Sequence, residues 1–500
     1  MAGRQFRAPA VALALLLALG ACTGNGYTAS DSGSAAQPGL LLGTAPAPAP
    51  AAESESGSGE VDPARTPEST FAMDVDTASY HYARNMIGQG LAPGVDGIRP
   101  EEFINSFRQD YPQPAGSAFS ITMDGARLPG GHRVTPEGGD VRLLRVGLQA
   151  SADDAASRPD ARLTFVLDVS GSMGDPGKLD VVKDALRAFA AQARPTDEVA
   201  IVTFSNDAEL LREMTPVRDS SGFLDAVDSL RPLSGTNLEK GLTRGYEVAR
   251  AAFRPGATNR VVLVSDALAN TGNTAPDAIL AEVREAAAKQ ITLLGVGVGN
   301  DYGDRLMEQL ADSGDGFTVY VSGSADARET FVRQLPAAVP VRALDAKVQV
   351  TFDADEVAGY RLIGYDNRRL DASEFRDDGV DGGEVMAGQS VTALYLVRLR
   401  PGASGTIAHT QLRWQDPGTR RPEESGADVS AATLAGGFPG AATGLQVSYV
   451  AAWFAEQLRH SDHGAALSHT DLIALADAAA SRTTDPAVAE LAALIRRSGD

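Results

Sequence analysis

Between residues 160 and 335 the chain alternates hydrophobic runs with amphipathic stretches, and this pattern strongly constrains the fold. The hydrophobic runs lie over residues 163–167, 199–204, 261–264 and 291–298. Stretches with helical spacing lie between them, as in Val182, Leu186 and Phe189. Strands that carry no polar face are buried on both sides of a sheet. The sequence therefore predicts an α/β fold, with a doubly wound, mainly parallel sheet covered by helices on both faces.

Oxygen-bearing side chains stand at the ends of two of these hydrophobic runs. The segment LTFVLDVSGSM, residues 163–173, ends in Asp168, Ser170 and Ser172, and the segment VVLVSD ends in Asp266. The glycine-containing stretch SGTN adds the hydroxyl of Thr236. Carboxylate and hydroxyl oxygens suit a hard cation, so we expect Mg²⁺, or Mn²⁺ or Ca²⁺, to bind here. Ligands of open parallel sheets bind at the carboxyl ends of strands, where Asp168 and Asp266 are predicted to lie.

The order D-x-S-x-S, then a Thr in a glycine loop, then a strand-terminal Asp resembles the metal-ion-dependent adhesion site (MIDAS) of von Willebrand factor type A (VWA) domains. The resemblance covers Asp168, Ser170, Ser172, Thr236 and Asp266. It implies a Rossmann-like domain in which the three hydroxyls hold the ion directly and the two carboxylates act largely through water. It also implies that a carboxylate from a partner protein completes the shell of the ion.

Two other interpretations of the same residues stay open. The D-x-S-x-S segment is also compatible with a strand-to-helix turn whose hydroxyls cap the following helix. The metal site is also compatible with a purely structural role.

The N-terminal residues resemble a bacterial lipoprotein signal. Residues 1–22 contain the basic residues Arg4 and Arg7, a short apolar core and the tetrapeptide LGAC, which ends in Cys22. An ordinary cleavable signal is the alternative. Cys22 is the single cysteine of the chain, and we expect it to be lipidated. Residues 23–66 are rich in Gly, Ser, Ala and Pro and are predicted to be a disordered linker.

The predicted VWA domain, residues 159–335, has a flanking region on each side. Residues 67–158 are predicted to be α+β, with a strand over 71–75 and a helix from Ala78. Residues 336–500 are predicted to be β-rich and to end in helices near 445–458, 471–480 and 486–497. The segments FAMDVDTASYHYARN and IGYDNRRL resemble those of bacterial YfbK-type VWA lipoproteins, a family whose C-terminal region has no known function.

Several classes of function find little support. The net charge of −21 would repel nucleic acid phosphates. The glycines of GVGVG, residues 295–299, lack the spacing of a phosphate-binding loop and are predicted to permit close helix packing. Asp74 and Asp76 are similar to a phosphatase nucleophile loop, but the preferred interpretation is that Asp76 caps the helix from Ala78. The histidines His460, His463 and His469 form a conceivable zinc site, although the residues between them predict a polar loop.

We therefore expect no enzyme, but an extracytoplasmic lipoprotein that binds a protein partner through a metal ion. A lipid on Cys22 would anchor it on the outer face of the plasma membrane, or on the outer membrane of a cell that has two. The alternative is an envelope scaffold in which the metal is structural and the flanking regions bind partners. A hydrolase that uses Asp74 or the histidines is the third possibility.

Overall fold

The computed structural model describes residues 59–499 except 74, 134–137, 153–157, 218–219, 267–275, 300–304, 322, 324–326, 328–329, 332–339, 367, 379 and 381. Cys22, residues 23–58 and Asp74 lie outside the described residues. The prediction of a disordered linker over 23–66 is wrong at its last residues, because Val61 forms a β-bridge with Tyr360 and Glu60 forms an ion pair with Arg398. These contacts are with residues distant in sequence, which the local composition does not reveal. Across the described part, no helix is both long and apolar enough to cross a membrane.

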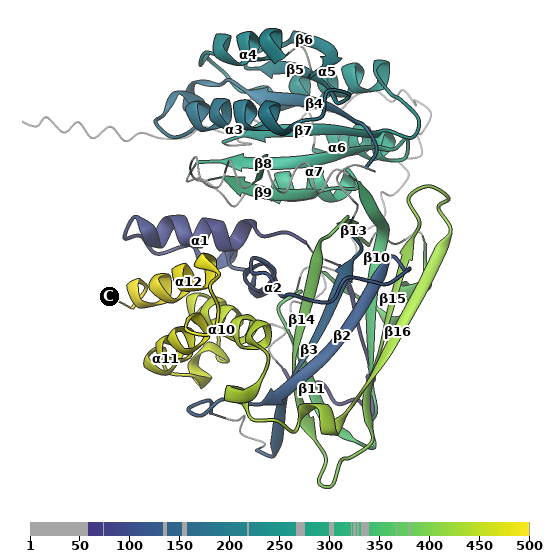
Figure 1. Cartoon of the computed structure of the whole chain (residues 1–500), viewed down its shortest axis with the longest axis vertical. Coiled ribbons are helices and arrows are strands. Elements are labelled where there is room, and N and C mark those ends of the chain that lie inside the picture. The colour runs from purple at the N-terminus through teal and green to yellow at the C-terminus, as the bar shows by residue number, and fades with distance from the viewer. Residues whose placement is uncertain are drawn as a thin grey trace, which may run out of the picture. The chain divides into compact units, whose positions relative to one another are not determined.

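A six-stranded sheet occupies the centre of the chain in the order β6-β5-β4-β7-β8-β9 (Figure 1). All its neighbours are parallel except β5 and the edge strand β6. Its strands are β4 (Ala161–Asp168), β5 (Glu198–Phe204), β6 (Ala208–Pro216), β7 (Thr258–Ser265), β8 (Ile291–Val298) and β9 (Phe317–Val321). The prediction of a doubly wound, mainly parallel sheet is confirmed.

Helices pack on both faces of this sheet because its inner strands are apolar on both faces. They are α3 (Leu179–Gln192), α4 (Ser220–Ser229), α5 (Leu238–Ala251), α6 (Pro276–Ala287) and α7 (Arg305–Ser313). Phe165 of β4 lies in one core with α3 and α4, and its ring centroid is 5.5 Å from that of Phe189. The next residue, Val166, lies in a second core with α5, α6 and α7. This switch of face between neighbours is the period of a strand.

The two flanking regions build two further sheets together. One has the order β12-β1-β10-β15-β16, with β13 also paired to β10, and the other has the order β11-β14-β3-β2. Strand β1 pairs antiparallel with β10, and β3 with β14. The strands are β1 (Glu68–Ala72), β2 (Phe119–Arg127), β3 (Asp140–Ala150), β10 (Val341–Phe352), β11 (Val357–Ile363), β12 (Arg369–Leu370), β13 (Gly383–Met386), β14 (Ser390–Leu399), β15 (Thr406–Gln415) and β16 (Pro422–Ser430). Residues before and after the central sheet thus share hydrogen-bonded ladders.

Helices from both ends of the chain form a separate apolar core. They are α1 (Ala78–Gly88), α2 (Pro100–Asn105), α10 (Thr443–Leu458), α11 (His469–Ala480) and α12 (Pro486–Arg497). Phe103 of α2 and Trp453 of α10 are fully buried in it. The prediction of a β-rich C-terminal region that ends in helices is confirmed.

Two local predictions near the first helix are wrong. The strand expected over residues 71–75 is β1, which ends at Ala72. Helix α1 has Thr77 rather than Asp76 as its N-cap residue, with no side-chain cap hydrogen bond. The buried carboxylate of Asp76 instead accepts a hydrogen bond of 2.8 Å from the backbone nitrogen of Thr318 in β9. A contact between residues so distant in sequence leaves no local signal, which is why the pattern suggested a cap.

Candidate metal centre

The predicted site lies where two adjacent strands end. Strands β4 and β7 pair in parallel, so Asp168, the last residue of β4, and Asp266, which follows β7, stand at the same edge of the sheet. After β4 the chain crosses to β5 on one side, whereas β7, β8 and β9 extend the sheet on the other. This point, where the strand order reverses, is the usual ligand crevice of an open parallel sheet.

Asp168 is completely buried, and donors hold both of its carboxylate oxygens. The backbone nitrogen of Ser170 donates to Oδ1 at 2.8 Å, and the hydroxyl of Ser265 donates to Oδ2 at 2.6 Å. Burial raises the pKa of Asp168, and the nearby Asp266 adds to this, while the hydrogen bonds from Ser265 and Ser170 oppose it. The carboxylate is therefore fixed in place as an acceptor.

A chain of hydrogen bonds joins Asp168, Ser170, Ser172 and Asp266. The hydroxyls of Ser170 and Ser172 are 3.0 Å apart, and Ser172 donates to Oδ1 of Asp266 at 3.0 Å. Ser170 is buried, whereas Ser172, in the short helix Gly171–Gly174, is exposed. The group therefore reaches solvent on the side of Ser172.

Thr236 lies on the loop between α4 and α5, and backbone contacts fasten that loop on both sides. The nitrogen of Leu233 donates to the carbonyl of Val169 at 2.6 Å, next to Asp168, and the nitrogen of Asn237 donates to the carbonyl of Ser205 at 2.6 Å. Between them Gly235 has φ +85°, and a Cβ there would lie 1.8 Å from Oδ1 of Asn206. Only glycine permits this close turn.

Sequence reasoning missed two residues of the site. Ser265 stands directly before Asp266, so its place at the strand end was a usable signal. Lys178 comes from the polar stretch GDPGK and carries no such signal. Its Nζ lies 2.7 Å from Oδ2 of Asp266 and 3.5 Å from Asp175.

The donor set fits a hard divalent cation, because it consists of hydroxyl and carboxylate oxygens. Among the described residues, no three His, Cys, Asp or Glu side chains gather as a metal-binding group. The histidine cluster is therefore not assembled as a zinc site, and Nδ1 of His469 instead lies 2.9 Å from Oε1 of Gln457.

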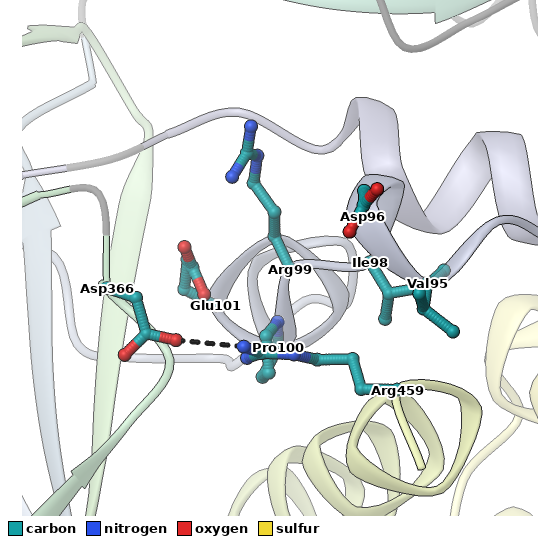
Figure 2. Close-up of a pocket in the computed structure, with 8 residues that line it drawn as sticks. All are labelled: Val95, Asp96, Ile98, Arg99, Pro100, Glu101, Asp366 and Arg459. Carbon is teal, nitrogen blue, oxygen red and sulfur yellow. Dashed lines mark hydrogen bonds and ion pairs between the residues drawn. The ribbon is translucent and has the colours of Figure 1, made fainter. Parts of the chain in front are cut away.

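A separate pocket of about 340 Å³ is shown in Figure 2. Its arginines are already engaged by carboxylates of the chain: Arg459 lies 3.1 Å from Asp366, and Arg99 lies 2.8 Å from Glu308. The residues that line the pocket bring three carboxylates and two guanidinium groups. None of its lining residues belongs to the predicted metal centre.

Three family models match the chain. They are described as von Willebrand factor type A domain, at residues 163–334, as uncharacterized protein YfbK, C-terminal, at 338–405, and as von Willebrand factor, at 53–133.

The chain is also similar to whole proteins. It is 31% identical to the uncharacterized protein YfbK of Escherichia coli over 67% of this chain and 59% of YfbK. It is 29% identical to inter-alpha-trypsin inhibitor heavy chain H3 of Pongo abelii over 51% of this chain and 30% of that protein. The matches thus span less than two thirds of the length of these relatives. A solved structure titled von Willebrand factor type A from Catenulispora acidiphila matches 66% of this chain and 76% of its own, with 17% identity and a TM-score of 0.41.

A VWA domain suggests protein–protein interaction. The chain contains a VWA domain, at residues 163–334.

Proposed function

We propose that this protein is an extracytoplasmic lipoprotein whose VWA domain holds a divalent cation and binds the carboxylate of a protein partner. The observation that carries the proposal is the hydrogen-bonded group of Asp168, Ser170, Ser172 and Asp266 at the carboxyl ends of β4 and β7. The same group accounts for why acids and hydroxyls end these two strands.

The hydroxyls of Ser170, Ser172 and Thr236 would hold the ion directly, with Asp168 and Asp266 supporting it largely through water. When bound, the ion supplies a Lewis-acidic position for an Asp or Glu of the partner. Neutral hydroxyl ligands leave more of the positive charge on the ion than carboxylate ligands would. A protruding carboxylate of the partner would then contact the ion. The need for such a carboxylate would make the interaction specific.

The anchor and the linker place this domain outside the cytoplasm in our proposal. Lipidation of Cys22 would hold the chain on the outer face of the plasma membrane, or on the outer membrane of a cell with two. The linker, residues 23–58, would separate the folded part from the lipid surface.

Calorimetric titration of Mg²⁺ and Mn²⁺ into the full chain tests the metal site. We expect saturable binding to one site, lost in Asp168→Ala. Asp184→Ala is the matched control, because it removes the same charge from an exposed position of α3. Equal binding by wild type and Asp168→Ala would refute the site assignment. Partner capture with and without a chelator separates the scaffold alternative, whose contacts should survive metal removal.

A further inference from the structure

A lysine ammonium is built into the proposed metal centre. Lys178 is the N-cap residue of α3 and is 9% exposed. Its Nζ lies 2.7 Å from Oδ2 of Asp266, whose other oxygen accepts the hydroxyl of Ser172. The ammonium is thus bound to one of the two carboxylates on which the cation would depend.

The neighbouring strand is shaped to admit this lysine. Gly299 follows β8 and has φ +99°, and a Cβ there would lie 2.9 Å from Cε of Lys178. The nitrogen of Gly299 donates to the carbonyl of Val321 at 3.2 Å, which holds the backbone in that position. The last glycine of GVGVG therefore makes room for the lysine, whereas Gly295 faces Met307 of α7, the helix packing expected from the sequence.

The lysine changes the charge balance of the site. Among the described residues, the buried Asp168 and Asp266 bring two negative charges and Lys178 brings one positive charge, a net charge of about −1. Asp175 also lies 3.5 Å from Nζ of Lys178, but its side chain is largely exposed and solvent screens its charge. At the rim, Asp207 pairs with Lys240, and together they add no net charge. A divalent cation would leave the site with one uncompensated positive charge, and one carboxylate from outside would neutralise it.

We propose that Lys178 weakens binding of the cation alone and couples its tight binding to an external carboxylate. This inference rests on the proposed function, because it specifies how the same metal site selects its partner. Lys178 acts here as an affinity-setting charge beside the ion. In the metal-free protein the same ammonium neutralises the buried Asp266.

The test measures Mn²⁺ affinity of the full chain, purified in detergent, in acetate and in chloride of equal ionic strength. In chloride, Lys178→Met should bind Mn²⁺ about tenfold tighter than wild type, the size expected for one unit charge near a divalent ion. Acetate should strengthen Mn²⁺ binding in wild type and strengthen it clearly less in Lys178→Met. If Lys178 were merely structural, its replacement would not both tighten Mn²⁺ binding in chloride and reduce the strengthening by acetate.

Two further variants separate charge from folding. Lys178→Gln keeps a donor toward Asp266 and loses the charge. It should therefore show the tighter binding and weaker acetate response predicted for Lys178→Met, and it provides the test if the methionine variant unfolds. Lys289→Met is the control, because it removes a lysine paired with Glu285 in the turn before β8, at the amino end of the strand. It should bind Mn²⁺ as wild type does.

The outcomes distinguish this inference from the function on which it rests. If wild type binds Mn²⁺ and both Lys178 variants match it or bind more weakly, with the same response to acetate, the coupling proposal is overturned and the metal site stands. If wild type binds no Mn²⁺ in either salt, the metal site itself is overturned, and the coupling proposal with it.

Discussion

At the scale of single residues, the hydrogen bonds around Asp168 decide whether a buried carboxylate can persist at the end of β4. Burying an ionised carboxylate is costly unless donors reach it. Ser265 and the backbone of Ser170 supply such donors at 2.6 and 2.8 Å. Burial is the main cause of the raised pKa of Asp168. Loss of a hydrogen-bond donor to this buried carboxylate should therefore lower the stability of the fold.

Ser265→Ala should lower the free energy of unfolding by about 2 kcal/mol, the usual range for a hydrogen bond to a charged group. Urea denaturation checks this value. Ser229→Ala is the control, because its hydroxyl donates to the carbonyl of Ala226 at an exposed helix end, and it should change stability by less than about 0.5 kcal/mol. Equal effects in the two variants would contradict the role given to Ser265.

A second prediction at the scale of residues concerns His132 and the pH dependence of stability. Burial, with a smaller contribution from His463, lowers the pKa of His132 to about 4. Its Nδ1 lies 2.7 Å from the hydroxyl of Tyr449. Between pH 6.5 and about 4, the unfolded chain therefore binds a proton at His132 that the folded chain does not. The free energy of unfolding should therefore fall as the pH falls through this window.

We expect His132→Gln to remove up to about 1.4 kcal/mol per pH unit from the slope of stability against pH in that window. Denaturant midpoints measured at several pH values give the slope. A variant whose slope equals that of wild type would show that His132 does not titrate in this way.

At the scale of elements, sequence periodicity predicted the strands that are apolar on both faces. It missed strands that form only because they pair with an adjacent strand. Strands β4, β5, β7 and β8 appear as hydrophobic runs, because each is buried in the sheet. Strand β16, PEESGADVS, is largely exposed and has no such run. It is a strand because it pairs with β15, and long-range pairing is not written in local sequence.

The same limit applies to the proposed metal centre. Asp168 and Asp266 were predictable at one edge because parallel strands end together. Lys178 was not, because it reaches Asp266 only after the chain has turned into α3 and β8 has placed Gly299 beside it.

Helix α5 gives a prediction at this scale, because its glycines bring it close to the sheet. A Cβ on Gly245 would lie 2.3 Å from Cγ2 of Val166, which is fully buried in β4. Gly245→Ala gains about 1 kcal/mol of helix propensity, but the clash should cost more, for a net loss of about 1–2 kcal/mol. Thermal unfolding measures whether Gly245→Ala is less or more stable than wild type.

Gly88 supplies the comparison, because it ends α1 and a Cβ there would have no atom within 4 Å. Gly88→Ala should leave stability unchanged or raise it slightly. A stabilised Gly245→Ala would contradict the close packing of α5 on β4.

At the scale of the whole molecule, the VWA domain is inserted between two stretches that build common sheets. Strand β1 enters the ladder of β10, and β3 enters that of β14, from opposite sides of residues 163–334. Asp76 contacts β9, and Arg99 contacts Glu308 of α7, so the domain is also bound to its flanks. The flanking regions therefore contact the VWA domain at β9 and α7.

The proposed lipid anchor on Cys22 is also tested at this scale. Cys22→Ser should abolish incorporation of radioactive palmitate and move the protein from the membrane fraction to the soluble extracytoplasmic fraction. Ser30→Ala, a change within the linker, should leave both unchanged. Palmitate incorporation that persists in Cys22→Ser would exclude this anchor, since the chain has no other cysteine.

The most direct test of the central claim is an anomalous difference map from a crystal grown with Mn²⁺. The account predicts one strong peak at the carboxyl ends of β4 and β7, bordered by the hydroxyls of Ser170 and Ser172. A map with no peak there, in which Ser172 still donates to Asp266, would contradict it.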